Sequence, residues 1–275
     1  SSVQGLAAFL PAEEGAVLAV DFAALRRTGL LDSLAASGVA QEPEYVSFVR
    51  DTGFDYATDL DYALVWFGKD SVYALARGRF RWDQLRAYVA RQRGVCQNSF
   101  CRMEGSTPER RISFFPLTRS VMALAVSADD WAATALTEQK PSRKAMSVPD
   151  RPVWVLLPAS TLARSENLPA GTRLFAKALE GSERVWLALD GSASGIAIEL
   201  DVTCKSEQDA STLEFQLRGV TDLLKKLIAR EGQAPNSADL SGVLAAGVFN
   251  RVDRRVLGRW PVSRQFLAYI LGGTK

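Results

Sequence analysis

The sequence predicts an α+β fold built from two tandem, similar β-α-β-β-α-β-β-α units, with antiparallel sheets and helices packed on one face. Three observations predict this fold. Apolar runs of strand length come in pairs around short turns, which is typical of β-hairpins. Amphipathic stretches of helical period separate those pairs. The order of elements also repeats, since Val17 and Val153 in the first strands, and Ser127 and Ser263 before the last helices, are each 136 positions apart (153 − 17 and 263 − 127). The middle elements are shifted, because the second half has a shorter first loop and a longer central helix.

A change of composition divides the chain near its midpoint. The segment Gln139–Asp150 (QKPSRKAMSVPD) is polar and charged and contains two prolines, which is typical of a linker. We therefore predict a first α+β repeat over residues 1–146 and a second over residues 147–275. Together the two halves are long enough to bury a substantial core.

In the first half, the segment Gly15–Leu25 is predicted to be a strand that runs into a helix ending near Ala36. The other strands are predicted from apolar runs at Tyr62–Phe67, Val72–Arg77, Ile112–Leu117 and Val121–Val126. Phe80–Arg91 is predicted to be a helix, because its apolar residues recur on one stripe. A capping box at Ser127–Asp130 predicts another helix through Leu136.

The second half repeats this pattern. Its strands are predicted at Val153–Leu157, Arg184–Leu189, Ile196–Cys204, Val243–Phe249 and Arg255–Val262. Its helices are predicted at Thr172–Leu179, after a cap at Ser206, and at Arg264–Leu271. The Gly191–Gly195 segment resembles the nucleophile elbow of serine hydrolases, but Ala193 stands where the nucleophile is required. A hairpin turn is therefore predicted there.

The chain has no histidine among its 275 residues. This excludes Ser-His-Asp and Cys-His catalysis, histidine-ligated metals and histidine pH switches. There is neither a P-loop nor a dinucleotide fingerprint. We therefore assign no catalytic residue and predict no cofactor. The 33 Lys+Arg and 31 Asp+Glu residues give a net charge of +2, which argues against a nucleic-acid partner.

Carboxylates gather in the segment Asp51–Asp61. Asp55, Asp59 and Asp61 could supply oxygen ligands to calcium, or the carboxylates of a histidine-independent hydrolase. Their spacing departs from the EF-hand loop, in which the glycine follows most of the acids. We favour a turn between a helix and a strand, with aspartates as caps, and predict no metal site.

The three cysteines have two different predicted roles. Cys96 and Cys101 lie in a polar loop, and we predict a disulfide between them, with two free thiols as the alternative. A disulfide implies an oxidising compartment. Cys204 ends an alternating apolar run and is predicted to be a buried, unreactive thiol. Three cysteines without histidine do not supply the four ligands of a structural zinc site.

Arginines form two groups along the predicted strands. The first is Arg77, Arg79 and Arg81, and the second is Arg251, Arg254, Arg255 and Arg259. By alternation the first group would share one strand face. Each group could bind an anion through charge-assisted hydrogen bonds. We favour charged protection of a solvated sheet edge.

Several short stretches resemble an uncharacterised family of exported bacterial proteins, known best from acidobacteria and their relatives. They are Phe9–Ala12 with the strand Ala16–Phe22, Thr52–Asp55 with Asp59–Asp61, Ala76–Phe80 and Arg254–Ser263. The resemblance implies a signal peptide or lipoprotein anchor upstream and a periplasmic or cell-surface location. It carries over no activity and no functional residue.

We therefore expect an exported, non-enzymatic binding or interaction module of the cell envelope, with a protein or small molecule as its partner. Its binding surface would be the groove between the repeats or the exposed face of a sheet. No apolar run reaches the roughly 18 residues of a membrane-spanning helix. Because the chain begins at Ser1, we expect a processed N-terminus. A histidine-independent hydrolase and a structural subunit of an envelope assembly remain alternatives.

Overall fold

The computed structural model of the chain describes residues 3–35, 43–144, 146–162, 170–192 and 195–267. The chain divides into two compact units, Ser1–Asp150 (unit 1) and Arg151–Lys275 (unit 2). This division lies at the end of the polar, proline-containing segment Gln139–Asp150, four residues after the boundary that the sequence predicted at residue 146. Both units combine helices with antiparallel strands, as an α+β fold requires.

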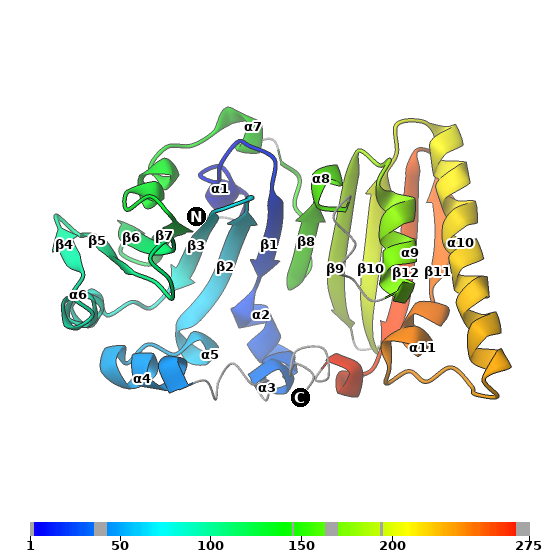
Figure 1. Ribbon diagram of the computed structural model, residues 1–275, viewed down its shortest axis with the longest axis horizontal. Helices are drawn as coiled ribbons and strands as arrows, with labels where there is room; N and C mark the ends of the chain where they lie inside the picture. Colours follow the sequence, from blue (N-terminus) through cyan, green and yellow to red (C-terminus); the bar gives the residue numbers. More distant parts are fainter. Residues whose placement is uncertain (1–2, 36–42, 145, 163–169, 193–194, 268–275) are drawn as a thin grey trace. The chain divides into compact units, whose positions relative to one another are not determined.

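Unit 1 contains a sheet whose described strands follow the order β1-β2-β3-β7-β6-β5-β4, with every neighbouring pair antiparallel (Figure 1). The strands are β1 (Ala16–Val20), β2 (Leu60–Phe67), β3 (Val72–Gly78), β4 (Val95–Gln97), β5 (Phe100–Glu104), β6 (Arg111–Thr118) and β7 (Val121–Ser127). The predicted apolar runs all became strands, most with one or two further residues at their ends.

The helices of unit 1 are shorter than predicted. They are α1 (Val3–Ala7), α2 (Phe22–Arg27), α3 (Leu30–Ala35), α4 (Pro43–Thr52), α5 (Tyr56–Asp59), α6 (Trp82–Arg91), α7 (Pro141–Lys144) and the 3-10 helix η2 (Ala132–Leu136). The single helix predicted to end near Ala36 divides at Gly29, whose φ of +68° ends α2. The predicted capping box opens no α-helix, because Asp129 accepts a hydrogen bond from the nearby Trp131 amide, in a turn before η2.

The cysteine segment is a β-hairpin and not the polar loop that we expected. Cys96 on β4 pairs with Cys101 on β5. The two turn residues, Asn98 and Ser99, have φ angles of +47° and +73°, and two positive φ angles are the mark of a type I′ turn. The hairpin escaped prediction because its strands are short and its turn contains no glycine.

Helices pack on both faces of the unit 1 sheet, which corrects the prediction of a single covered face. On one face Leu85 and Val89 of α6 pack with Cys101 and Phe114. On the opposite face η2 packs against β5, β6 and β7, through its alanines with Phe100, Phe115 and Ala125. Successive residues of a strand point to opposite sides, so Cys101 and Phe100 must face different layers.

Unit 2 contains a sheet whose described strands follow the order β8-β9-β10-β12-β11, again antiparallel throughout. The strands are β8 (Val153–Leu157), β9 (Arg184–Ser192), β10 (Gly195–Thr203), β11 (Val248–Val252) and β12 (Arg255–Val262). The helices are α8 (Ala159–Leu162), α9 (Ala170–Leu179), α10 (Glu207–Arg230) and α11 (Leu240–Ala245). Residues 264–267 are also helical, and the rest of the helix predicted there lies outside the described residues.

The strand predicted at Val243–Phe249 is wrong over its first five residues. The Asp239 side chain accepts a hydrogen bond from the Gly242 amide at 2.7 Å and caps α11, so Val243 is helical and β11 begins only at Val248. A short apolar run fits a buried helix and a strand equally well.

The core of unit 2 lies between α10 and one face of the sheet. Ser206 caps α10 by accepting from the Asp209 amide at 3.0 Å, as predicted. Leu213 and Leu217 of α10 then pack with Leu200 and Val202 of β10. Figure 1 shows α9 and α10 on the same side of β9–β12. The residues that alternate with the core positions therefore point to the opposite face of this sheet.

Candidate functional site

The carboxylates predicted as calcium candidates hold a turn together. Asp55 caps α5 by accepting from the Ala57 amide at 2.9 Å. Asp59 accepts from the Asp55 amide at 2.9 Å and pairs with Arg79 at 3.1 Å. Asp61 pairs with Arg26 at 3.2 Å. Caps and ion pairs of this kind are typical of a turn. Two of the three carboxylates pair with arginine, whereas calcium ligands would converge on one ion.

No group of three or more His, Cys, Asp or Glu side chains suited to a metal ion occurs among the described residues. The hairpin predicted at Gly191–Gly195 forms between β9 and β10, whose register pairs Ser192 with Gly195. Its two central residues, Ala193 and Ser194, lie outside the described residues.

The members of the two arginine groups have different partners, and only some of them pair with carboxylates. Arg77, Arg79 and Arg81 do not share a strand face, because β3 ends at Gly78. Arg77 lies over the Tyr62 ring, and Arg79 also donates to the Thr58 carbonyl oxygen at 2.7 Å. In the second group, Arg255 and Arg259 pair with carboxylates of unit 2.

Cys204 has the predicted character of an unreactive thiol. It is free and buried, with 2% of its surface exposed, and packs in the core beside Val202. Burial raises the pKa of the Cys204 thiol, and the nearby Asp209 and Glu183 raise it further. The nucleophilic thiolate is therefore disfavoured at this position.

The disulfide predicted between Cys96 and Cys101 is present. The two residues lie directly opposite each other across β4 and β5, and Cys101 also packs in the cluster beneath α6. The disulfide therefore joins the two strands of the outer hairpin of unit 1, and Cys101 attaches this hairpin to the core.

The face of the unit 2 sheet opposite α10 carries the candidate site, which we call the β10–β12 groove. It has a volume of about 570 Å³ and is lined by Glu199 and Asp201 of β10, Val248 and Asn250 of β11, and Arg255, Leu257, Arg259 and Pro261 of β12. Strand alternation places these side chains on one face, because they lie two positions apart along each strand.

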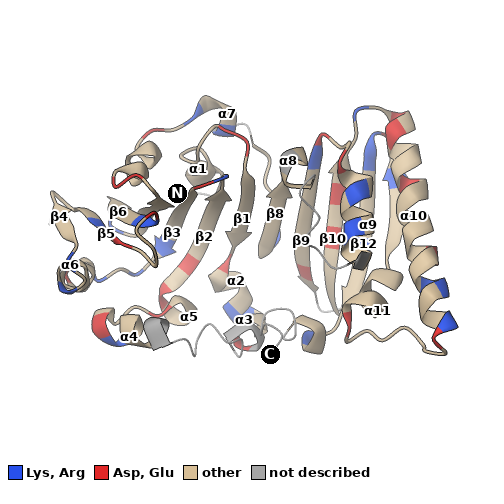
Figure 2. Cartoon of the chain, viewed as in Figure 1, with Lys and Arg blue, Asp and Glu red and all other residues tan. Residues whose placement is uncertain are grey.

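Ion pairs form the walls of the β10–β12 groove. Nη1 of Arg259 donates to Glu199 at 2.8 Å and to Asp190 on β9 at 2.9 Å. Glu199 in turn accepts from Nε of Arg151 at 2.8 Å. Arg255 pairs with Asp201, and this hydrogen bonding raises the pKa of Arg255. Three arginines thus meet three carboxylates in and beside the groove, and their charges cancel. Figure 2 shows basic and acidic segments interspersed along unit 2.

Aliphatic side chains form the remainder of the β10–β12 groove. Leu257 lies between Arg255 and Arg259 along β12 and is partly exposed. Val248 on β11 is 59% exposed, and Pro261 is exposed as well. Sequence reasoning identified the arginines but not this groove, because its β10, β11 and β12 residues become neighbours only when the sheet forms. The alternation of Arg255, Leu257, Arg259 and Pro261 was the only local signal.

No protein-family model matches the chain, and no curated protein does either. Solved structures of the treponemal protein TP0453 are similar to it. Crystal form IV has a TM-score of 0.54 at 10% identity, covering 98% of this chain and 96% of that one. Form III gives 0.53 at 9% identity, over 96% and 95%, and form I gives 0.52 at 11%, over 99% and 98%. At these identities the likeness shows the fold alone.

Proposed function

We propose that this chain is an exported, non-enzymatic binding protein of the cell envelope, and that it docks a protein partner in the β10–β12 groove. The observation that carries the proposal is the groove itself, in which exposed aliphatic side chains lie between charges already paired within the chain. Because Arg255 and Arg259 are held by carboxylates, the groove offers fixed hydrogen-bonding groups rather than a free acid, base or nucleophile.

The composition of the groove favours a protein over a small molecule. Arginine is enriched in protein interfaces, and apolar contact at the centre with polar groups around it is their usual arrangement. Val248 and Leu257 supply apolar contact surface, and the paired arginines supply polar groups beside it. The cancelled charge of these polar groups favours a partner segment of low net charge, since a strongly charged segment would find no opposing field.

We further propose that the two units are a tandem duplication. The order β1-β2-β3-β7-β6 in unit 1 matches the order β8-β9-β10-β12-β11 in unit 2, strand for strand along the chain. In this correspondence β4 and β5 are an insertion specific to unit 1. Equal strand order, together with the offset of 136 residues at the first strand and before the last helix, supports a common origin of the halves.

The proposed exported location is supported by the disulfide, because such crosslinks persist in oxidising compartments. The resemblance to exported bacterial proteins, with a signal peptide or lipid anchor upstream, points the same way. No described helix combines the length and the apolarity that a bilayer crossing needs.

Site-specific photocrosslinking in native envelope extract tests the proposed function. A photoreactive phenylalanine analogue at Val248 is expected to capture a defined protein, and Leu257→Asp should abolish that capture. The same analogue at Phe215, which is 79% exposed on α10, is the matched control and should not capture that protein. Equal capture from both positions, or capture that survives Leu257→Asp, would refute the groove as the docking surface.

A further inference from the structure

A second concavity lies in unit 1, beside the turn of the β4–β5 hairpin. This hairpin pocket has a volume of about 240 Å³ and is lined by Asn98, Ser99, Phe100, Phe115, Pro116 and Thr137. None of these side chains is charged. Pockets for drug-sized ligands have volumes of roughly 300–1,000 Å³, so this one has room for a single ring.

Stacked planar groups form the apolar wall of the hairpin pocket. Phe100 stacks on Phe115 with ring centroids 5.9 Å apart and an interplanar angle of 22°. Phe100 also stacks on Trp131, at 5.0 Å and 20°, and the Arg102 guanidinium lies 4.2 Å from the Trp131 ring centroid. The Phe100 ring therefore packs against two neighbouring rings, which fix its orientation before any ligand arrives.

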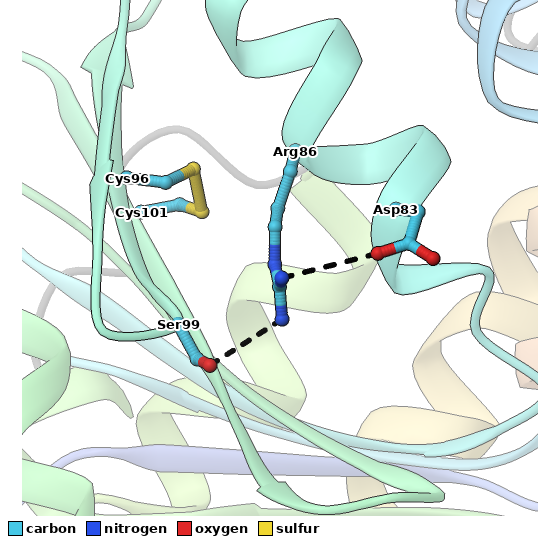
Figure 3. The surroundings of a disulfide bond; sticks show 5 residues. All are labelled: Asp83, Arg86, Cys96, Ser99 and Cys101. Carbon is cyan, nitrogen blue, oxygen red and sulfur yellow. Dashed lines mark hydrogen bonds and ion pairs between the residues drawn. A yellow bond between two sulfur atoms is a disulfide. The ribbon is translucent and has the colours of Figure 1, made fainter.

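The polar rim of the pocket is also held in place. Asn98 and Ser99 form the tight turn of the hairpin that the Cys96–Cys101 disulfide closes. Figure 3 shows Arg86 of α6 between this turn and Asp83. Nη2 of Arg86 lies 3.4 Å from the Ser99 hydroxyl oxygen, and Nη1 lies 3.8 Å from the Asp83 carboxylate.

The rim offers both donors and acceptors without charge. The Ser99 hydroxyl accepts from Arg86, so its proton can be donated to a ligand. The Thr137 hydroxyl donates to the Thr134 carbonyl oxygen at 2.7 Å, so its lone pairs can accept. The exposed amide of Asn98 supplies both kinds of group.

We propose that the hairpin pocket binds one neutral hexopyranose ring of a glycan. A pyranose presents a face of C–H groups to an aromatic surface and a circle of hydroxyls that both donate and accept, which matches the apolar wall and the uncharged rim. A proline-rich peptide presents only carbonyl acceptors along a chain, so it would need a longer groove lined by donors. A charged ligand would find no opposite charge in the lining.

Saturation-transfer NMR and calorimetry on the full chain test this proposal, with methyl β-glucopyranoside and N-acetylglucosamine as probes. We expect millimolar binding of at least one sugar. Thr137→Val removes a rim hydroxyl, and Asn98→Asp places a negative charge beside the ring and keeps the turn geometry. Each should weaken binding roughly fivefold or more. Asn236→Asp, the same exchange at an exposed position that lines neither concavity, should leave binding unchanged.

Three results would overturn the assignment. The first is that neither sugar binds. The second is that Thr137→Val and Asn98→Asp bind as tightly as the unaltered chain. The third is that a decaproline probe binds with the same dependence on these residues while the sugars do not. Reduction of the disulfide adds an independent readout, since a loosened Asn98–Ser99 turn should weaken sugar binding. The pocket and the β10–β12 groove share no residue, so each proposal can fail alone.

Discussion

Arg218 of α10 donates a hydrogen bond from Nη2 to the main-chain carbonyl oxygen of Phe249 on β11, at 3.0 Å. The same guanidinium pairs with Glu214 one turn earlier on the helix, at 2.8 Å. β11 is the outermost strand of the described order in unit 2. Outer strands expose main-chain groups that can pair with another chain, so an arginine that occupies one of their carbonyls protects that edge.

Replacing this arginine should therefore weaken unit 2 and expose its edge. Arg218→Ala removes the hydrogen bond to Phe249, and we expect the free energy of unfolding to fall by about 1 kcal/mol. We also expect more self-association at high concentration. Urea denaturation and light scattering measure the two effects. Lys226→Ala, an exposed change on the same helix, is the control and should alter neither.

Loss of the disulfide should destabilise the chain through its outer hairpin. Because the closed loop is short, the chain-entropy estimate gives a loss of about 2 kcal/mol for the double variant Cys96→Ala, Cys101→Ala. Dithiothreitol should lower the stability of the unaltered chain and leave the double variant unchanged. A variant that unfolds at the same urea concentration as the unaltered, oxidised chain would contradict this expectation.

Two glycines near α10 should respond in opposite directions to alanine. Gly219 lies inside the helix with open space around its Cβ position, so Gly219→Ala should raise the free energy of unfolding by about 0.5–1 kcal/mol. Gly232 follows the helix at a φ of +68°, so Gly232→Ala should lower it by about 1 kcal/mol through backbone strain. Thermal or urea denaturation of the two variants checks both signs, and a shift in the same direction for both would count against this account of α10.

The buried thiol of Cys204 should make the chain less stable in alkali. Burial raises its pKa above the ordinary value of 9.0, so the folded chain keeps a proton that the unfolded chain loses. The stability from this group is complete below that ordinary value and is lost as the pH rises through the folded value. We expect Cys204→Val to reduce the fall in unfolding free energy between about pH 8 and about pH 10.5.

Part of that alkaline fall should remain in Cys204→Val. Burial also raises the pKa values of Tyr73 and Tyr56, with nearby carboxylates contributing to each. Urea denaturation at the two pH values separates the contributions. An identical pH dependence in the variant and the unaltered chain would show that Cys204 does not titrate differently in the two states.

The predictable parts of the fold depend on short stretches of chain. Apolar runs such as Val153–Leu157 and Arg255–Val262 became strands with unchanged bounds, because a buried strand is recognisable from its own residues. The Ser206 cap and the apolar stripe of α10 could also be predicted from residues close together in the sequence. Predictions were wrong where one apolar pattern fits both a helix and a strand. Val243 packs into the core from a helix, although a strand would have buried it as well.

The candidate sites could be predicted only in fragments. The alternating arginines of β12 were visible, but Arg259 reaches Asp190, 69 residues earlier, and no local pattern contains that pairing. Likewise the sequence does not show that Phe100 and Phe115 stack, because they come together only through the pairing of β5 with β6. For Asp55 and Asp59 the sequence favoured a turn, but the pairing of Asp59 with Arg79, 20 residues later, lies outside any local pattern.

The sequence by itself determined the α+β class, most of the strands, the Cys96–Cys101 crosslink and the exclusion of every histidine-dependent mechanism, because each follows from residue types or from periods within about ten residues. Only the tertiary structure decided which charges cancel and which rings stack. Strand order and register bring together residues that lie far apart along the chain, and the β10–β12 groove and the hairpin pocket are made of such residues.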